Sequence, residues 1–199
     1  MCRHINSERI VYGTTTFGAA RKSPAEVIFG GRGIVNIGGK SPDAVQKVKE
    51  LLMRADIDTS ITDNPGRIVW LKALINAGIN PLASILGIKN GQILESTYAL
   101  ELQAAIIKEA VEAAHSAGND FDYDAILEET RSICRKTANN TCSMLQDIIA
   151  GRKTEIESIN LRIVEAGTAA GINMECNRTV SMLVKALEES GNSSRTIRY

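Results

Sequence analysis

Segment 70–82, WLKALINAGINPL, restricts the fold of this chain more than any other stretch of its sequence. The apolar residues in and beside it recur at spacings of three and four positions, and this period predicts an α-helix. On that helix Lys72, Asn76 and Asn80 lie on one stripe, each about one turn from the next. Asparagine is a poor helix former because its side chain competes for backbone hydrogen bonds. Two asparagines at this spacing therefore indicate a purpose other than helix stability.

The polar stripe has two interpretations. An ammonium group and two carboxamides can bind an oxygen-rich small molecule, because the ammonium supplies charge and a proton while each amide supplies a donor and an acceptor. The same spacing also suits the solvated face of an ordinary amphipathic helix. The spacing alone leaves both interpretations open.

Composition excludes several classes of protein. The chain has 23 Lys plus Arg and 23 Asp plus Glu, so no field of one sign attracts it to nucleic acid or to an anionic membrane. Its 199 residues, 44% of them hydrophobic, suffice for a sizeable core. Lys72 interrupts the longest apolar run before it reaches the roughly 20 residues of a membrane span, and the start MCRHINSERI is too polar for a signal peptide. We therefore expect a cytoplasmic protein without a membrane partner.

The cysteines predict neither a metal site nor a disulfide framework. Cys2, Cys134, Cys142 and Cys176 show no CxxC spacing and no accompanying histidine pattern. Free thiols in a reducing compartment are the simplest interpretation.

Residues 9–39 differ from the rest of the chain. The stretches RIVYGTTTF, AEVIFG and GIVNIGG are rich in β-branched and aromatic residues, which predicts three short strands. Gly30, Gly31 and Gly33 are expected to turn the second strand into the third. Three strands make a poor sheet alone, and their unpaired edges favour contact with something larger.

From Ser41 onward the pattern is helical. Ser41 is the predicted N-cap of a first helix that ends near residue 55, with Pro42 at the first helical position and Asp43 beside it. Further helices are expected over residues 95–117, 122–137 and 177–190, and the junction of Asn80 with Pro81 is expected to break the helix that carries the stripe.

A second polar region lies in residues 139–167. Ser143 and Asp147 stand one helical turn apart, and Thr154 with Glu157 has the spacing of a capping box that would start a helix at Glu155. We expect a mainly α protein, a bundle of six or seven helices with a small N-terminal β segment. The predicted organisation is a β segment at 1–40, a helical domain at 41–190 and a flexible tail at 191–199.

Two motifs in these regions resemble those of a known family. The first is Trp-x-Lys-x-x-x-Asn-x-x-x-Asn-Pro, met by Trp70, Lys72, Asn76, Asn80 and Pro81. The second is Asn-x-x-Ser-Met-x-x-Asp followed by Thr-Glu-Ile, met by Asn140, Ser143, Met144, Asp147, Thr154, Glu155 and Ile156. Together they resemble the C-terminal domain of the ketopantoate reductase family, whose members reduce 2-dehydropantoate to pantoate with NADPH. The stretches YGTTTFGA and GRGIVNIGG are similar to the last strands of the family's nucleotide-binding domain.

The resemblance implies a fold and a set of roles. The fold is that of the C-terminal domain of 6-phosphogluconate dehydrogenase, preceded by the remainder of a Rossmann-type sheet. Lys72 is implied as the catalytic acid that protonates the carbonyl oxygen of the substrate. The implied substrate-binding residues are Asn76, Asn80, Ser143 and Glu155, supported by Asp147 and Asn140. Glu155 is also a candidate for contact with the cofactor, and no metal is implied.

The chain departs from the family pattern in several places. Leu161 stands where the family usually has glycine, Cys142 replaces the first serine of Ser-Ser-Met, and Glu175 replaces a common proline. No GxGxxG is present, and GGRG at 30–33 neither has that spacing nor precedes a predicted helix. The chain is therefore expected to bind no NADP(H) and to be inactive alone.

Two functions follow as expectations. In the first, the chain supplies the substrate and catalytic-acid domain of a ketopantoate reductase in pantothenate and coenzyme A biosynthesis. Its partners would then be a 2-keto acid and either a second copy, as in a dimer, or a separate nucleotide-binding part. In the second, it is a non-catalytic helical oligomerisation or binding module derived from that family.

Overall fold

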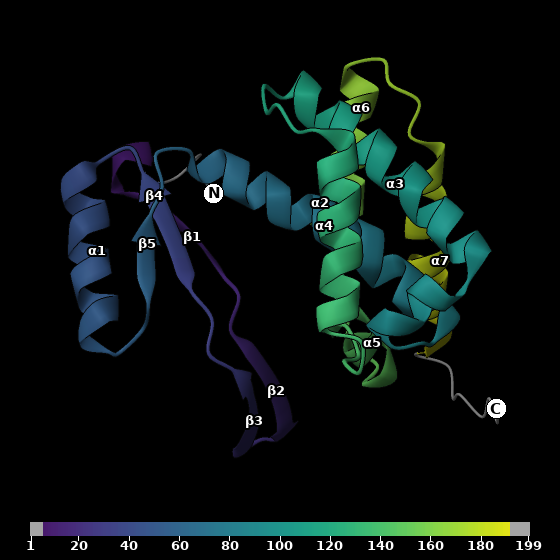
Figure 1. Ribbon diagram of the computed structural model, residues 1–199, viewed down its shortest axis with the longest axis horizontal. Coiled ribbons are helices and arrows are strands. Elements are labelled where there is room, and N and C mark those ends of the chain that lie inside the picture. The colour runs from purple at the N-terminus through teal and green to yellow at the C-terminus, as the bar shows by residue number, and fades with distance from the viewer. Residues whose placement is uncertain (1–5, 192–199) are drawn as a thin grey trace. The chain divides into compact units, whose positions relative to one another are not determined.

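The structure, a computed structural model, describes residues 6–191. It divides into two compact units, Met1–Val69 and Trp70–Tyr199. Seven α-helices and five β-strands are present in the described residues, which confirms the predicted mainly helical class with a small N-terminal β segment (Figure 1). The division falls inside helix α2 (Pro65–Leu86), whereas the sequence suggested a boundary after residue 40.

A three-stranded sheet is the centre of the first unit. Strands β1 (Val11–Thr15), β4 (Val35–Gly39) and β5 (Thr59–Ile61) lie in the order β1-β4-β5, with β1 antiparallel and β5 parallel to β4. Parallel neighbours need a crossover connection, and helix α1 (Pro42–Arg54) supplies it between β4 and β5. Helix α1 contacts all three strands, so it belongs with the sheet. Its predicted cap is confirmed, because the Ser41 hydroxyl accepts a hydrogen bond from the Ala44 backbone N–H.

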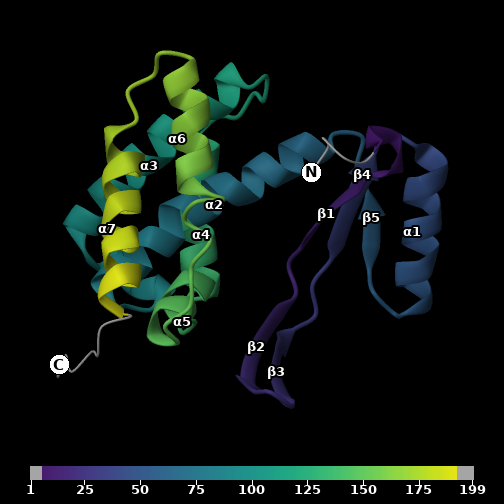
Figure 2. The same cartoon turned by 180° about the vertical axis from the view of Figure 1, so that it is seen from behind.

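A separate hairpin extends from this sheet (Figure 2). Strands β2 (Gly18–Ser23) and β3 (Glu26–Gly31) pair only with each other in the described residues. The prediction of three strands was wrong, since neither β2, with the unpromising sequence GAARKS, nor the three-residue β5 was expected. The segment from Gly31 to Gly33 was also expected to turn one strand onto the next, but it links two strands of different sheets.

Helix α2 continues through Pro81, so the predicted break at Asn80 and Pro81 was wrong. Proline has no backbone N–H, which leaves the carbonyl of the residue four positions earlier without its helical donor. That carbonyl belongs to Ala77, and the buried side chain of Asn160 donates to it from Nδ2 at 3.4 Å. The missing backbone donor is thus replaced by a side chain from another helix, and the helix remains intact.

The second unit surrounds the later part of α2. Its other elements are the short 3-10 helix η2 (Asn90–Glu95) and helices α3 (Thr97–Ser116), α4 (Tyr123–Lys136), α5 (Ser143–Ile149), α6 (Asn160–Ala169) and α7 (Glu175–Gly191). Every residue from Ala77 to Ser84 is buried, so α2 is covered on all sides there. By length and composition α2 could cross a membrane, but 56% of its most apolar window is buried, as in the core helix of a soluble protein.

Two further predictions about helix ends are corrected or left aside. Residues 155–159 form turns and α6 begins only at Asn160, so the capping box at Thr154 and Glu157 was wrong. The Thr154 hydroxyl does accept from the Ile156 N–H, but it also donates to Glu188. Thr154 is therefore bonded to α7 and does not cap a helix that starts at Glu155. The flexible tail predicted for 191–199 lies, from residue 192 on, outside the described residues.

Candidate functional site

The polar stripe of α2 runs from the surface into the core of the second unit. Lys72 is exposed, Asn76 is half-buried, and Asn80 is only 5% exposed. Within the described residues, no hydrogen bond joins the side-chain amide of Asn76 or Asn80 to another residue of the chain. The donor and the acceptor of each amide therefore remain available to bind a ligand. A helix face that only contacts solvent would not need an amide at a buried position.

Cys142 connects the stripe to the second polar region. Its Sγ donates to the backbone carbonyl of Asn80 at 3.7 Å and lies 3.7 Å from the Ser84 hydroxyl. It also accepts from the Leu145 N–H at 3.4 Å and so caps the N-terminus of α5. Ser143 follows directly as the first residue of α5, and the structure thereby brings the Ser143 and Asn80 segments together.

The thiol of Cys142 is a structural group. Burial raises its pKa, so it stays protonated and can donate to Asn80. Cys142, and not the neighbouring Ser143, is the N-cap of α5. The Ser143 side chain is exposed at the start of α5.

The backbone of Glu155 is held on both sides. Before it, Thr154 donates to Glu188 Oε1 from both its backbone N–H, at 2.7 Å, and its hydroxyl, at 2.6 Å. After it, the Ile156 side chain is fully buried. The carbonyl of Glu155 itself accepts from the N–H groups of Ser158 and Ile159, both at 3.0 Å. The Glu155 side chain is nevertheless exposed, so a fixed backbone presents its carboxylate to solvent.

The two residues expected to support the site both tie loops in place. Asp147 of α5 accepts from Arg152 Nε and Nη2 at 2.9 and 2.7 Å, which holds the start of the loop that carries Glu155. Asn140 accepts from the Asn90 N–H at 3.1 Å through its backbone carbonyl. Their predicted effect on catalysis stays a prediction.

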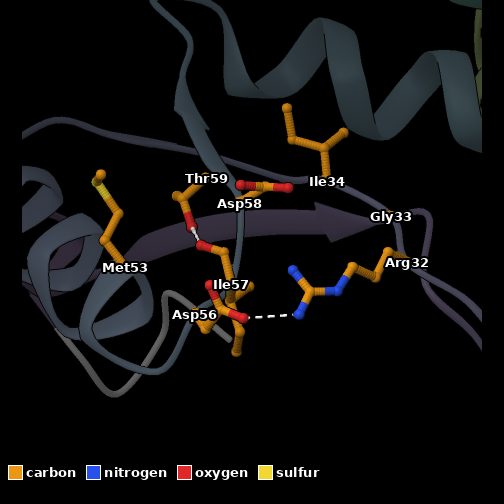
Figure 3. A pocket seen from close by; sticks show the side chains of 8 residues that line it. All are labelled: Arg32, Gly33, Ile34, Met53, Asp56, Ile57, Asp58 and Thr59. Carbon is orange, nitrogen blue, oxygen red and sulfur yellow. Dashed lines mark hydrogen bonds and ion pairs between the residues drawn. The ribbon is translucent and has the colours of Figure 1, made fainter.

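A surface cavity of about 590 Å³ in the first unit is lined by Arg32, Gly33, Ile34, Met53, Asp56, Ile57, Asp58 and Thr59 (Figure 3). It lies where β4 and β5 begin, whereas open α/β sheets bind ligands beyond the carboxyl ends of their parallel strands. Its Arg32 and Asp56 are paired at 2.7 Å. We therefore assign it no role in the expected reaction.

Neither a metal site nor a nucleotide loop is found in the part of the chain that the structure describes. Within residues 6–191, no group of three or more His, Cys, Asp or Glu side chains is placed to hold a metal ion. The glycine-rich segment 30–33 leads into strand β4 and not into a helix, so its residues do not fit a dinucleotide pyrophosphate.

The sequence pattern did not predict the roles of three residues of this region: Glu188, which holds Thr154; Cys142, which joins α5 to α2; and Asn160, which compensates for Pro81. Each acts on a partner far away in the sequence, and no local pattern signals such a pairing.

Comparison with known proteins places the chain in a family. Residues 66–188 match the family described as "Ketopantoate reductase PanE/ApbA C terminal". The chain is 37% identical over 191 residues to the 2-dehydropantoate 2-reductase of Pyrococcus horikoshii, covering 94% of this chain and 63% of the relative. It is 33% identical over 183 residues to that of Archaeoglobus fulgidus, covering 90% of this chain and 61% of the relative. The chain thus spans less than two thirds of the length of these relatives.

Solved structures share the fold. A D-mandelate dehydrogenase in complex with NADH and anilino(oxo)acetate superposes with a TM-score of 0.87 at 26% identity, covering 94% of this chain and 63% of that one. The 2-dehydropantoate 2-reductase of Methylococcus capsulatus gives a TM-score of 0.83 at 26% identity, covering 92% and 64%. With its helical unit matched almost throughout, this chain belongs to the ketopantoate reductase family.

Proposed function

We propose that the chain supplies the substrate-binding and proton-donating domain of an NADPH-dependent 2-dehydropantoate reductase. The observation that carries the proposal is the arrangement on α2, where two amides without a hydrogen-bond partner among the described residues lie one and two turns beyond an exposed lysine. The relatives named 2-dehydropantoate 2-reductase support the reaction. The anilino(oxo)acetate in complex with the D-mandelate dehydrogenase is an oxamate, which like a 2-oxo acid has a carbonyl next to its carboxylate, and this supports 2-oxo acids as the substrate class.

In this proposal the reaction needs an acid beside the substrate carbonyl. A reduced nicotinamide bound by a nucleotide-binding part would supply hydride to the carbonyl carbon. Negative charge then develops on the carbonyl oxygen, and Lys72 donates a proton to that oxygen and later regains one from solvent. Asn76 and Asn80 orient the substrate, Ser143 contacts its carboxylate, and Glu155 accepts a hydrogen bond from its hydroxyl.

The substrate part of the proposal can be tested on the chain alone. We expect calorimetry to detect binding of 2-dehydropantoate, and Asn76→Ala to weaken it roughly tenfold, the effect of losing a hydrogen bond to a charged ligand. Asn173→Ala, which changes an exposed asparagine between α6 and α7, is the matched control and should bind normally. Equal affinities for the two variants would contradict the assigned role of the stripe.

The catalytic part requires the chain joined to a nucleotide-binding domain of the family. In that protein Lys72→Ala should lower kcat by roughly 100- to 10,000-fold, the contribution of a general acid, with little change in KM. Lys108→Ala, which changes an exposed lysine of α3, is the control. A Lys72→Ala enzyme with the turnover of the control would favour the non-catalytic module.

A further inference from the structure

We propose that Glu188, near the end of α7, is a positioning residue that holds the Glu155 carboxylate where it can distinguish a hydroxylated 2-oxo acid from one without the hydroxyl. The inference rests on the proposed function, because it assigns Glu155 to the substrate hydroxyl. Glu188 of α7 is then a further residue on which the preference for the hydroxylated 2-oxo acid depends, and this dependence can be measured.

Glu188 lies in a nearly buried environment. Its side chain is only 9% exposed, and an ionised carboxylate is costly to bury unless its oxygens are hydrogen-bonded. Oε1 accepts both hydrogen bonds from Thr154, and Oε2 lies 3.0 Å from Lys185 Nζ. Both oxygens are therefore used, and one of them is used entirely on the residue that precedes Glu155.

Glu188 acts on Glu155 through the side chain of Thr154. The Thr154 hydroxyl donates to Glu188 and at the same time accepts from the Ile156 N–H at 3.3 Å. This turn spans Glu155, and the buried Ile156 side chain fixes its far end. Removing the Glu188 carboxylate frees the near end only, so the loop can move while its core anchor stays in place.

A second ion pair reinforces the same contact between α7 and the loop. Lys185 Nζ also donates to Glu157 Oε1 at 2.6 Å. Lys185 thus links α7 to the loop on the other side of Glu155, and Glu188 lies between Lys185 and Thr154. Lys185 and Glu188, three positions apart on α7, therefore bond to the loop on both sides of Glu155, the candidate substrate-binding residue.

The experiment compares two ligands on the intact chain. 2-Dehydropantoate carries the hydroxyl, and trimethylpyruvate is the same 2-oxo acid with hydrogen in its place. We expect the wild-type chain to bind 2-dehydropantoate roughly tenfold more tightly, the effect of one hydrogen bond to a charged group. Glu188→Gln and Thr154→Val should each abolish that preference, so that the two ligands bind about equally. The affinity for trimethylpyruvate should stay within about twofold of the wild-type value.

The controls separate positioning from general stability. Thr154→Ser keeps the hydroxyl and should keep most of the preference, and Glu189→Gln changes the exposed neighbour and should keep all of it. Hydrogen exchange of the Thr154 amide, measured by NMR without any ligand, should accelerate at least about tenfold in Glu188→Gln, because the amide loses its charged acceptor.

Three results would overturn the inference. Unchanged exchange at Thr154 in Glu188→Gln would show that the carboxylate does not hold the loop, whatever the ligand. A wild-type preference that survives in Glu188→Gln and Thr154→Val would overturn the positioning role and leave the proposed function intact. A wild-type chain without any preference would overturn the assignment of Glu155 to the hydroxyl, and the positioning role with it.

Discussion

Pro81 and Asn160 should be energetically coupled, because Pro81 lacks a backbone hydrogen-bond donor and the Asn160 side chain replaces that donor. Asn160 is completely buried, and its Nδ2 donates to Ala77 O at 3.4 Å and to Asn177 Oδ1 at 3.1 Å. Asn160→Ala would leave these two buried acceptors unpaired, at about 1–3 kcal/mol each. It would also remove the Asn160 Oδ1, which is itself buried without a partner, and this offsets part of the loss. We expect a net destabilisation of about 2–4 kcal/mol.

Changing the proline should reduce that penalty. In Pro81→Ala the new backbone N–H can donate to Ala77 O, so Asn160→Ala then leaves only Asn177 Oδ1 unpaired. The cost of Asn160→Ala should be smaller in this background by about 1–3 kcal/mol, the penalty for one buried acceptor.

The coupling can be measured with a double-mutant cycle. Trp70 is the one tryptophan of the chain and packs against the core of the second unit, so its fluorescence during urea unfolding reports on that unit. Pro42→Ala provides the control cycle, since Pro42 is at the start of α1, where no intrahelical donor is needed. A coupling of less than about 0.5 kcal/mol between Pro81 and Asn160, no larger than in the control, would refute the argument.

Three further outcomes are expected. Gly78→Ala should destabilise the second unit by about 1–3 kcal/mol in urea unfolding, because its Cβ would lie 2.7 Å from Ile107 Cδ1; unchanged stability would mean that this side chain moves aside freely. Burial alone would raise the pKa of Glu188, but hydrogen bonds from Thr154 and Lys185 lower it below the usual value. The stabilising effect of Glu188 is therefore complete above the unfolded-state pKa of about 4.3 and disappears as the pH falls through the lower folded-state pKa. The unfolding curves of wild type and Glu188→Gln should therefore converge in acid. A stability difference that persists at low pH would contradict this. The hairpin exposes 61% of Phe29, so the chain should self-associate at micromolar concentration and Phe29→Lys should weaken this in sedimentation velocity, whereas a wild-type monomer would contradict it.

Local signals in the sequence determined most of the helices and the choice of candidate residues. Ser41 and Asp122 accept hydrogen bonds at the starts of α1 and α4, and Gly118 follows the end of α3 with a φ of +80°. Such caps depend on residues three or four positions apart, which the sequence displays directly. The stripe on α2 was equally visible, because helical period alone places Lys72 and Asn76 on one side.

Contacts between distant residues decided what that period could not show. A local rule predicted a helix break at Pro81. The break does not occur, because Asn160 donates to the carbonyl of Ala77, 83 residues away in the sequence. The helix expected at Glu155 was replaced by turns while Thr154 bonds to Glu188, 34 residues away. A backbone donor or acceptor is satisfied equally well by any suitable group that the fold brings within reach, so local preference is overridden there.

The candidate site shows the same division. Residue types and their spacing, with the family motifs, identified Lys72, Asn76, Asn80, Ser143 and Glu155. Only the tertiary structure could show that Cys142 joins the Ser143 helix to Asn80 across 62 residues, and that both sides of Glu155 are anchored. Chemistry is carried by individual side chains and can be recognised in a sequence, whereas position depends on packing between segments and is decided only when the chain is folded.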